Sequence, residues 1–176
     1  MTTSLDLNVS MPELTRTLLD IYSVSGEEKT IADAVYEALS AYPHLHLTRD
    51  GDAMIARTEF GPRNGEERTR ILLAGHLDTV PLPTVAGSLG TVPASIVEDN
   101  GDWILYGRGA TDMKGGVAVQ LKLAAELGEH DTDYNLTYVF YDHEEVASEL
   151  SGMARLIRNH GELLTDADFG VLLEPT

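Results

Sequence analysis

One short apolar run constrains the fold of this 176-residue chain more than any other feature. Residues 71–74 read Ile-Leu-Leu-Ala, without the polar alternation of a half-buried strand, and Gly75 and His76 follow directly. Such a run is typical of a strand that is buried on both faces, as in parallel sheets covered by helices. The strand brings His76 to its carboxyl end, where open α/β sheets collect their functional side chains.

Segments of helical and strand-like periodicity alternate along the rest of the chain. Helices are predicted over residues 12–22, 25–42, 117–127 and 145–160, the first capped by Ser10 and the last closed by Gly161. Strands are predicted over residues 45–48, 53–58, 70–75, 103–107, 136–141 and 170–173, with a long loop over residues 79–97. This alternation predicts one α/β domain: a three-layer sandwich with a mixed, mostly parallel sheet and helices on both faces.

Composition excludes several kinds of partner and site. The formal net charge is −17 and no basic stretch breaks it, so we expect no nucleic-acid partner. The first six residues lack the positive start and apolar run of a signal peptide, and no apolar stretch is long enough to span a bilayer. We therefore expect a cytoplasmic protein without membrane contact. The chain has no cysteine, so a metal would have to bind histidine and carboxylate side chains.

Acids and one histidine follow the predicted strands. They are His76 and Asp78, Glu144 and Glu145, and Glu174, with Asp112 in a glycine-rich loop before a predicted helix. Roughly thirty residues separate each group from the next, as expected for a site assembled from successive strand–helix units. Oxygen and imidazole ligands without sulfur suit a hydrolytic Zn²⁺, Co²⁺ or Mn²⁺ site.

Each of these residues also has a purely structural interpretation. Asp112 could be a helix N-cap, and Glu144 and Glu145 could be acids of a first helical turn, favoured by the helix dipole. His76 could be a packed core histidine and Asp78 a solvated loop acid. The adjacent carboxylates nevertheless allow one to bind a metal while the other moves protons.

Four motifs in order resemble the dizinc deacylases and exopeptidases related to aminoacylase. The motifs are Leu72–Pro81, Gly107–Gly116, Glu144-Glu145 and Glu174–Thr176. Within that family, Tyr141–Ala147 together with the last motif is most similar to the succinyl-diaminopimelate desuccinylases, especially those of actinobacteria. Acetylornithine deacetylases share much of the pattern, so another N-acyl amino acid remains the alternative substrate.

The resemblance implies a ligand set for two Zn²⁺ ions, with Co²⁺ as a substitute. His76 and Glu174 would bind one ion, Glu145 the other, and Asp112 would bridge the two. A cis peptide is implied between Asp112 and Met113.

The resemblance also implies catalytic roles. Asp78 would orient His76, and Glu144 would take a proton from the attacking water and pass it to the departing amine. The implied products are succinate and L,L-diaminopimelate. Arg108 and Lys114 are candidates for contacting an anionic substrate, with solvent exposure as the alternative for both.

Two departures from the family pattern stand beside Glu144. His143 occupies a position where many relatives have aspartate, and Ala147 one where many have glycine. We interpret His143 as an ordinary packing or surface residue.

The family continues well beyond Glu174-Pro175-Thr176. We therefore expect residues 1–176 to be a partial zinc-dependent catalytic domain, an incomplete zinc-exopeptidase-like fold. It would lack an inserted dimerisation or lid domain, the remaining strands and the last histidine ligand. The chain alone is then expected to be inactive and its parent a homodimer through the missing domain. The alternatives are a non-catalytic metal-binding fragment and a plain α/β fold whose acids are caps and surface charges.

Overall fold

A computed structural model describes residues 4–175 of the chain. Residues 1–3, which begin the segment tested for a signal peptide, and Thr176 of the last motif lie outside the described residues. The helices are α1 (Met11–Leu19), α2 (Lys29–Ser40), α3 (Gly115–Glu126) and α4 (Gly152–His160). The strands are β1 (His46–Asp50), β2 (Ala53–Arg57), β3 (Arg70–His76), β4 (Ser95–Asp99), β5 (Asp102–Tyr106), β6 (Asn135–Tyr141) and β7 (Phe169–Leu172).

The central sheet has the strand order β1-β2-β6-β3-β7 among the described residues. β3 pairs in parallel with β6 and with β7, whereas β2 is antiparallel to both β1 and β6. Only β2 therefore runs against the other strands, and the prediction of a mixed, mostly parallel sheet is confirmed. Because His76 pairs with Tyr141 and Ala74 with Leu172, the carboxyl ends of three parallel strands meet at one edge.

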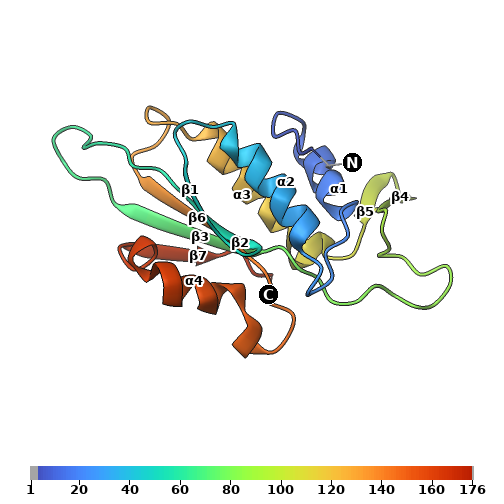
Figure 1. Cartoon of the computed structure of the whole chain (residues 1–176). Helices are drawn as coiled ribbons and strands as arrows, with labels where there is room; N and C mark the ends of the chain where they lie inside the picture. Colours follow the sequence, from blue (N-terminus) through green and yellow to red (C-terminus); the bar gives the residue numbers. More distant parts are fainter. Residues whose placement is uncertain (1–3, 176) are drawn as a thin grey trace.

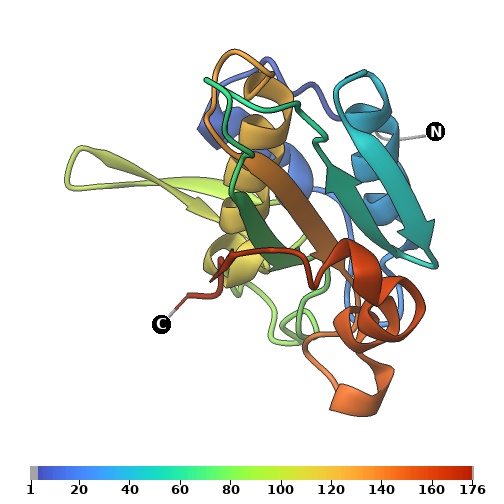
Figure 2. The same cartoon turned by 90° about the vertical axis from the view of Figure 1, so that its left-hand side faces the viewer.

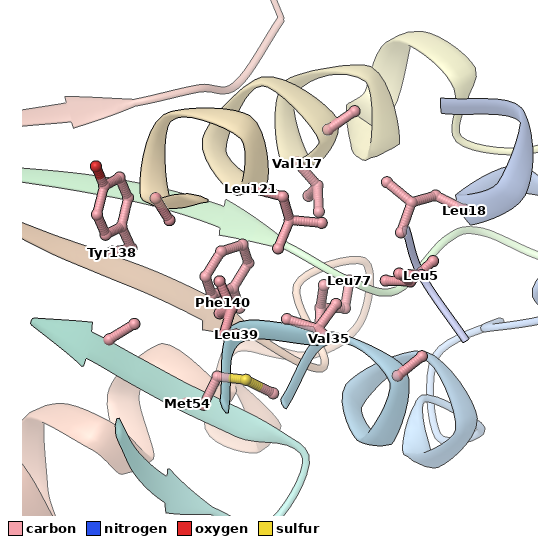
Figure 3. Close-up of a cluster of buried hydrophobic side chains, with 14 of the residues drawn as sticks. Leu5, Leu18, Val35, Leu39, Met54, Leu77, Val117, Leu121, Tyr138 and Phe140 are labelled. Carbon is pink, nitrogen blue, oxygen red and sulfur yellow. The ribbon is translucent and has the colours of Figure 1, made fainter. Parts of the chain in front are cut away.

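Helices cover both faces of this sheet, as predicted (Figure 1). α1, α2 and α3 lie on one face and α4 lies on the other. The larger core fills the space under α1, α2 and α3. Most of its labelled side chains come from these helices and from β2 and β6, while Leu5 precedes α1 and Leu77 follows β3 (Figure 3). The smaller core, under α4, includes Ile55, Ala74, Val139 and Leu156. Alternate residues of β2 and β6 serve the two cores because neighbouring strand residues point to opposite faces.

The helices form where apolar residues recur at helical spacing. α1 follows Ser10 at its N-cap, has Pro12 in its first turn, and buries Leu14, Leu18 and Leu19. In the part of the chain that the structure describes, no helix combines the length and the apolar character needed to cross a membrane.

The prediction of one long loop over residues 79–97 was wrong at its end. Ser95–Asp99 forms β4, which pairs antiparallel with β5 through a turn at Asn100 and Gly101, both of positive φ. This two-stranded hairpin extends away from the main sheet, so β5 is not one of that sheet's strands (Figure 2). The sequence Asp99-Asn100-Gly101-Asp102 carries turn residues, and this signal was missed.

The predicted helix over residues 145–160 was too long at its start. α4 begins at Gly152 with Ser151 as its N-cap, and residues 148–150 form a short 3₁₀ turn. Residues 143–147 are irregular, with His143 in the left-handed region at φ 58°. Glu144 and Glu145 are therefore not first-turn acids of a helix. Tertiary hydrogen bonds, described below, hold this segment instead.

Candidate metal centre

His76 lies at the centre of the site, fully buried at the carboxyl end of β3. Its Nδ1 lies 2.9 Å from the main-chain oxygen of Asp78, which holds the ring in one orientation. Its Nε2 lies 3.0 Å from Oδ1 of Asp112 and 3.7 Å from Oε2 of Glu174. Burial lowers the pKa of His76, but the surrounding carboxylates outweigh burial and raise it to about 9. The site thus favours positive charge at Nε2, where a cation could replace the proton.

Asp78 anchors the segment that carries the paired glutamates. Its buried carboxylate accepts hydrogen bonds from the main-chain N–H of Glu144 and of Glu145, both at 3.0 Å, and from the Ser25 hydroxyl at 2.6 Å. Burial raises the pKa of Asp78, yet its hydrogen bonds outweigh that effect and lower it to about 2. Its Oδ1 also lies 3.4 Å from Nδ1 of His76, so the carboxylate and the main-chain oxygen both face the ring.

Asp112 is held by a kinked turn, η1 (Ala110–Lys114), rather than by a helix terminus. Gly109 enters the turn at φ 79°, and a Cβ there would lie 2.6 Å from the Thr79 side chain, so glycine is required. Asp112 has non-helical dihedral angles, and the peptide bond to Met113 is cis, as the resemblance implies. The N-cap interpretation of Asp112 is therefore wrong: α3 has Lys114 at its N-cap position.

Two overlapping groups of side chains have their potential ligand atoms within 4.8 Å of one another. One comprises His76, Asp112 and Glu174, and the other comprises His76, Glu144 and Glu145. Burial raises the pKa of both Glu145 and Glu174, and neighbouring carboxylates, Asp112 among them, raise it further. Crowded carboxylates beside an imidazole form a donor set that suits a hydrolytic divalent cation, so the residues fit the metal that the resemblance implies.

A cavity of about 490 Å³ opens beside these groups. Asp112 and Glu145 line it, together with Val80 and residues 104–111, which include Arg108. Nε of Arg108 is buried without a hydrogen-bond partner among the described residues.

Lys114 does not belong to this cavity lining. Its side chain is buried, and Nζ donates hydrogen bonds to the main-chain oxygens of Leu18 and Ile21. Burial lowers the pKa of Lys114 to about 8. The prediction that Lys114 contacts an anionic substrate or solvent was wrong, because this lysine ties η1 to the end of α1.

Sequence reasoning missed two residues that support the site, Ser25 and Glu28. Ser25-Gly26-Glu27-Glu28 was interpreted as the start of a helix, whereas Ser25 contacts Asp78 and Glu28 contacts the amide of His143. Glu28 is 1% exposed, which is unusual for a glutamate and cannot be inferred from its exposed neighbour Glu27.

Comparison with known proteins places the chain among metallopeptidase relatives. A sequence model described as peptidase family M20/M25/M40 matches residues 72–176. The chain is 45% identical to a putative succinyl-diaminopimelate desuccinylase of Mycobacterium tuberculosis over 98% of its length, and 40% identical to the succinyl-diaminopimelate desuccinylase of Corynebacterium glutamicum over 93%. It spans 44% and 41% of those two proteins, less than half of each.

The fold is shared with solved structures. An M20 family metallo-carboxypeptidase from Sulfolobus solfataricus superposes with a TM-score of 0.71 at 17% identity, covering 93% of this chain and 37% of that one. At this identity the likeness concerns the fold alone. It confirms the predicted α/β class.

Proposed function

This chain belongs to peptidase family M20/M25/M40, and we propose that its fold is part of the catalytic domain of a metal-dependent amide hydrolase. The observation that carries the proposal is the convergence of five carboxylates and one imidazole at the carboxyl edge of β3. His76, Asp112, Glu145 and Glu174 would hold two Zn²⁺ ions, with Co²⁺ as a substitute. A bound divalent cation would polarise the substrate carbonyl and lower the pKa of the attacking water.

The chain's own residues then divide the work. Asp78 accepts the amides of Glu144 and Glu145 and so holds both side chains near His76. Glu144 acts as the general base, taking a proton from the attacking water, and as the general acid, delivering it to the departing amine. The carboxylate that receives the proton thus returns to its starting state, and each turnover cleaves one amide bond.

We propose N-succinyl-L,L-diaminopimelate as the substrate, cleaved to succinate and L,L-diaminopimelate. The support is the 45% and 40% identity to proteins described as succinyl-diaminopimelate desuccinylases. Arg108 lines the cavity beside Asp112 and forms no ion pair among the described residues, so it is available to a substrate carboxylate. Activity is expected of a longer protein that carries this segment, with the matched relatives more than twice as long.

The metal site can be tested on this chain directly. Calorimetric titration of the metal-free chain with Zn²⁺ should show micromolar or tighter binding, abolished in folded His76→Ala and Asp112→Ala variants. Glu144→Gln keeps the proposed ligands and should still bind Zn²⁺. A folded wild-type chain that binds no divalent ion would refute the assignment and favour caps and surface charges as the roles of these acids.

The substrate is tested by product release. A full-length protein that carries this segment should release succinate from N-succinyl-L,L-diaminopimelate, and Glu144→Gln should lower kcat by at least about a hundredfold. Release of acetate alone, from acetylornithine, would replace the substrate while keeping the reaction. Failure to cleave any N-acyl amino acid despite bound metal would support the non-catalytic alternative.

A further inference from the structure

The main-chain N–H groups of residues 143–145 all donate hydrogen bonds to buried carboxylates. Two side chains, Asp78 and Glu28, accept all three. Asp78 accepts the N–H of Glu144 and of Glu145, as described above. The N–H of His143 donates instead to Oε1 of Glu28, at 3.2 Å. Glu28, at the N-cap position of α2, thereby contacts a residue 115 positions later in the chain.

Glu28 is itself fixed on its other side. Its Oε2 accepts the N–H of Gly26 at 2.8 Å, and Ser25 donates to Asp78 from the same turn. Gly26 has φ 93°, so this turn depends on a conformation that glycine adopts readily. The turn before α2 therefore holds both carboxylates that contact residues 143–145: Glu28 through the N–H of Gly26, and Asp78 through the hydroxyl of Ser25.

The backbone at His143 needs such a support. A φ of 58° is uncommon for a residue with a side chain, and it places His143 in the left-handed region between the end of β6 and Glu144. The imidazole assists, because its Nδ1 lies 2.8 Å from Oδ2 of buried Asp142 and 3.4 Å from Oε1 of Glu28. Asp142 is in turn paired with Arg155 of α4 at 2.7 Å.

We propose that Glu28 is a positioning residue, which fixes the left-handed turn at His143 and thereby directs Glu144 and Glu145 toward His76. This inference rests on the proposed function, because it assigns Glu28 a part in shaping one of the two ligand groups. Glu28 does not touch the reacting atoms. It acts through the backbone of residues 143–145, as an outer partner that orients metal ligands.

Substitution of Glu28 removes hydrogen-bond acceptors from a buried position. In Glu28→Gln, one side-chain oxygen becomes an NH₂ donor, so either the Gly26 or the His143 amide loses its acceptor. Glu28→Asp keeps the charge but is one methylene shorter, and cannot hold both amides at once. Glu27→Gln is the matched control, since Glu27 is exposed and adjacent.

The decisive measurement is amide hydrogen exchange in the metal-free chain, followed residue by residue with NMR. Glu28→Gln and Glu28→Asp should each speed exchange of the amides of residues 143–145 at least about tenfold, while amides in β2 and β6 keep their wild-type rates. Glu27→Gln should leave all of them unchanged. A general loss of stability would instead speed exchange across the whole sheet, and that result would overturn a positioning role.

Zn²⁺ titration of the same variants supplies a second measurement. Affinity should fall by about tenfold in both Glu28 variants and remain at the wild-type value in Glu27→Gln. Wild-type exchange rates and affinity in Glu28→Asp would refute the inference while leaving the proposed function intact, and this holds even where Glu28→Gln does not fold. If the wild-type chain binds no Zn²⁺, the proposed function fails, and the exchange rates alone decide the role of Glu28.

Discussion

The candidate metal centre has a buried half and an exposed half. His76 and Asp78 have fully buried side chains, whereas those of Asp112 and Glu174 are 46% and 42% exposed. Asp78 accepts three hydrogen bonds from other segments of the chain, but Glu174 follows an edge strand and faces the crowded carboxylates around His76.

This difference separates residues that support the fold from residues that would only bind the metal. A buried carboxylate that accepts several hydrogen bonds stabilises the fold as well as the site, because its removal leaves buried donors without partners. An exposed carboxylate among like charges contributes little to folding, and its role is confined to what it binds. Substitutions in the two halves should therefore be distinguishable by comparing stability with metal affinity.

The largest effect is expected for Asp78→Ala in the buried half. The Ser25 hydroxyl and two main-chain amides would lose their acceptor, and His76 would lose a neighbouring charge. Breaking such a buried network should lower the free energy of unfolding by about 3 kcal/mol and abolish Zn²⁺ binding. Urea denaturation measures the first effect, and a loss below about 1 kcal/mol would contradict the supporting role.

An intermediate effect is expected for Asp166→Asn, which tests an exposed carboxylate paired with buried cations outside the site. Asp166 is 46% exposed but pairs with Arg57 and Arg70, which are 8% and 7% exposed. Because solvent screens the exposed partner, we expect a loss of about 1 kcal/mol at neutral pH.

The pH dependence of the same variant has a definite sign. Hydrogen bonds from Arg57 hold the pKa of Asp166 below its ordinary value of 3.8. Its contribution to stability is therefore complete above that value and is lost as the pH falls through the lower folded-state pKa. Between pH 5 and pH 2, the midpoint temperature of thermal unfolding should fall less steeply for Asp166→Asn than for the wild type. Parallel curves would contradict this role.

The smallest effect on stability is expected for Glu174→Gln in the exposed half. Burial and neighbouring carboxylates raise the pKa of Glu174, so neutralising it removes an unfavourable charge. The free energy of unfolding of the metal-free chain should change by about 0.5 kcal/mol or less, while Zn²⁺ affinity falls at least tenfold. A loss of stability comparable to that of Asp78→Ala would erase the distinction between the halves.

Much of the framework could be predicted because its signals are local. The apolar run of β3 required a strand covered on both faces, and the spacing of leucines in α1 required an amphipathic helix. His76, Glu145 and Glu174 each follow a predicted strand, and because the carboxyl ends of neighbouring parallel strands meet at one edge of a sheet, their convergence could also be predicted. These properties follow from periodicity and from the handedness of strand connections, which need no knowledge of distant contacts.

Two of the failures have a different cause from the missed turn at residues 99–102. Residues 145–151 have helical composition, and a helix was predicted to begin at Glu145, but α4 begins only at Gly152. The amide hydrogen bonds that Asp78 and Glu28 accept hold the start of this stretch, residues 143–145, in an irregular conformation. Lys114 was a candidate for contacting an anionic substrate or solvent, yet it donates hydrogen bonds to the main-chain oxygens of Leu18 and Ile21. In both cases hydrogen bonds to distant segments, which the local pattern does not specify, decide where the segment or the side chain lies.

The sequence by itself determined the α/β class, the buried strand that carries His76, and the set of side chains able to form a metal centre. Only the tertiary structure decided that Asp78 and Glu28 support the glutamates, that Asp112 and Glu174 stay exposed, and that Lys114 is structural. The physical reason is that burial and hydrogen-bond partnership belong to pairs of residues, and the Glu28–His143 pair joins segments 115 residues apart. Periodicity along one segment cannot specify which distant segment will satisfy its polar groups.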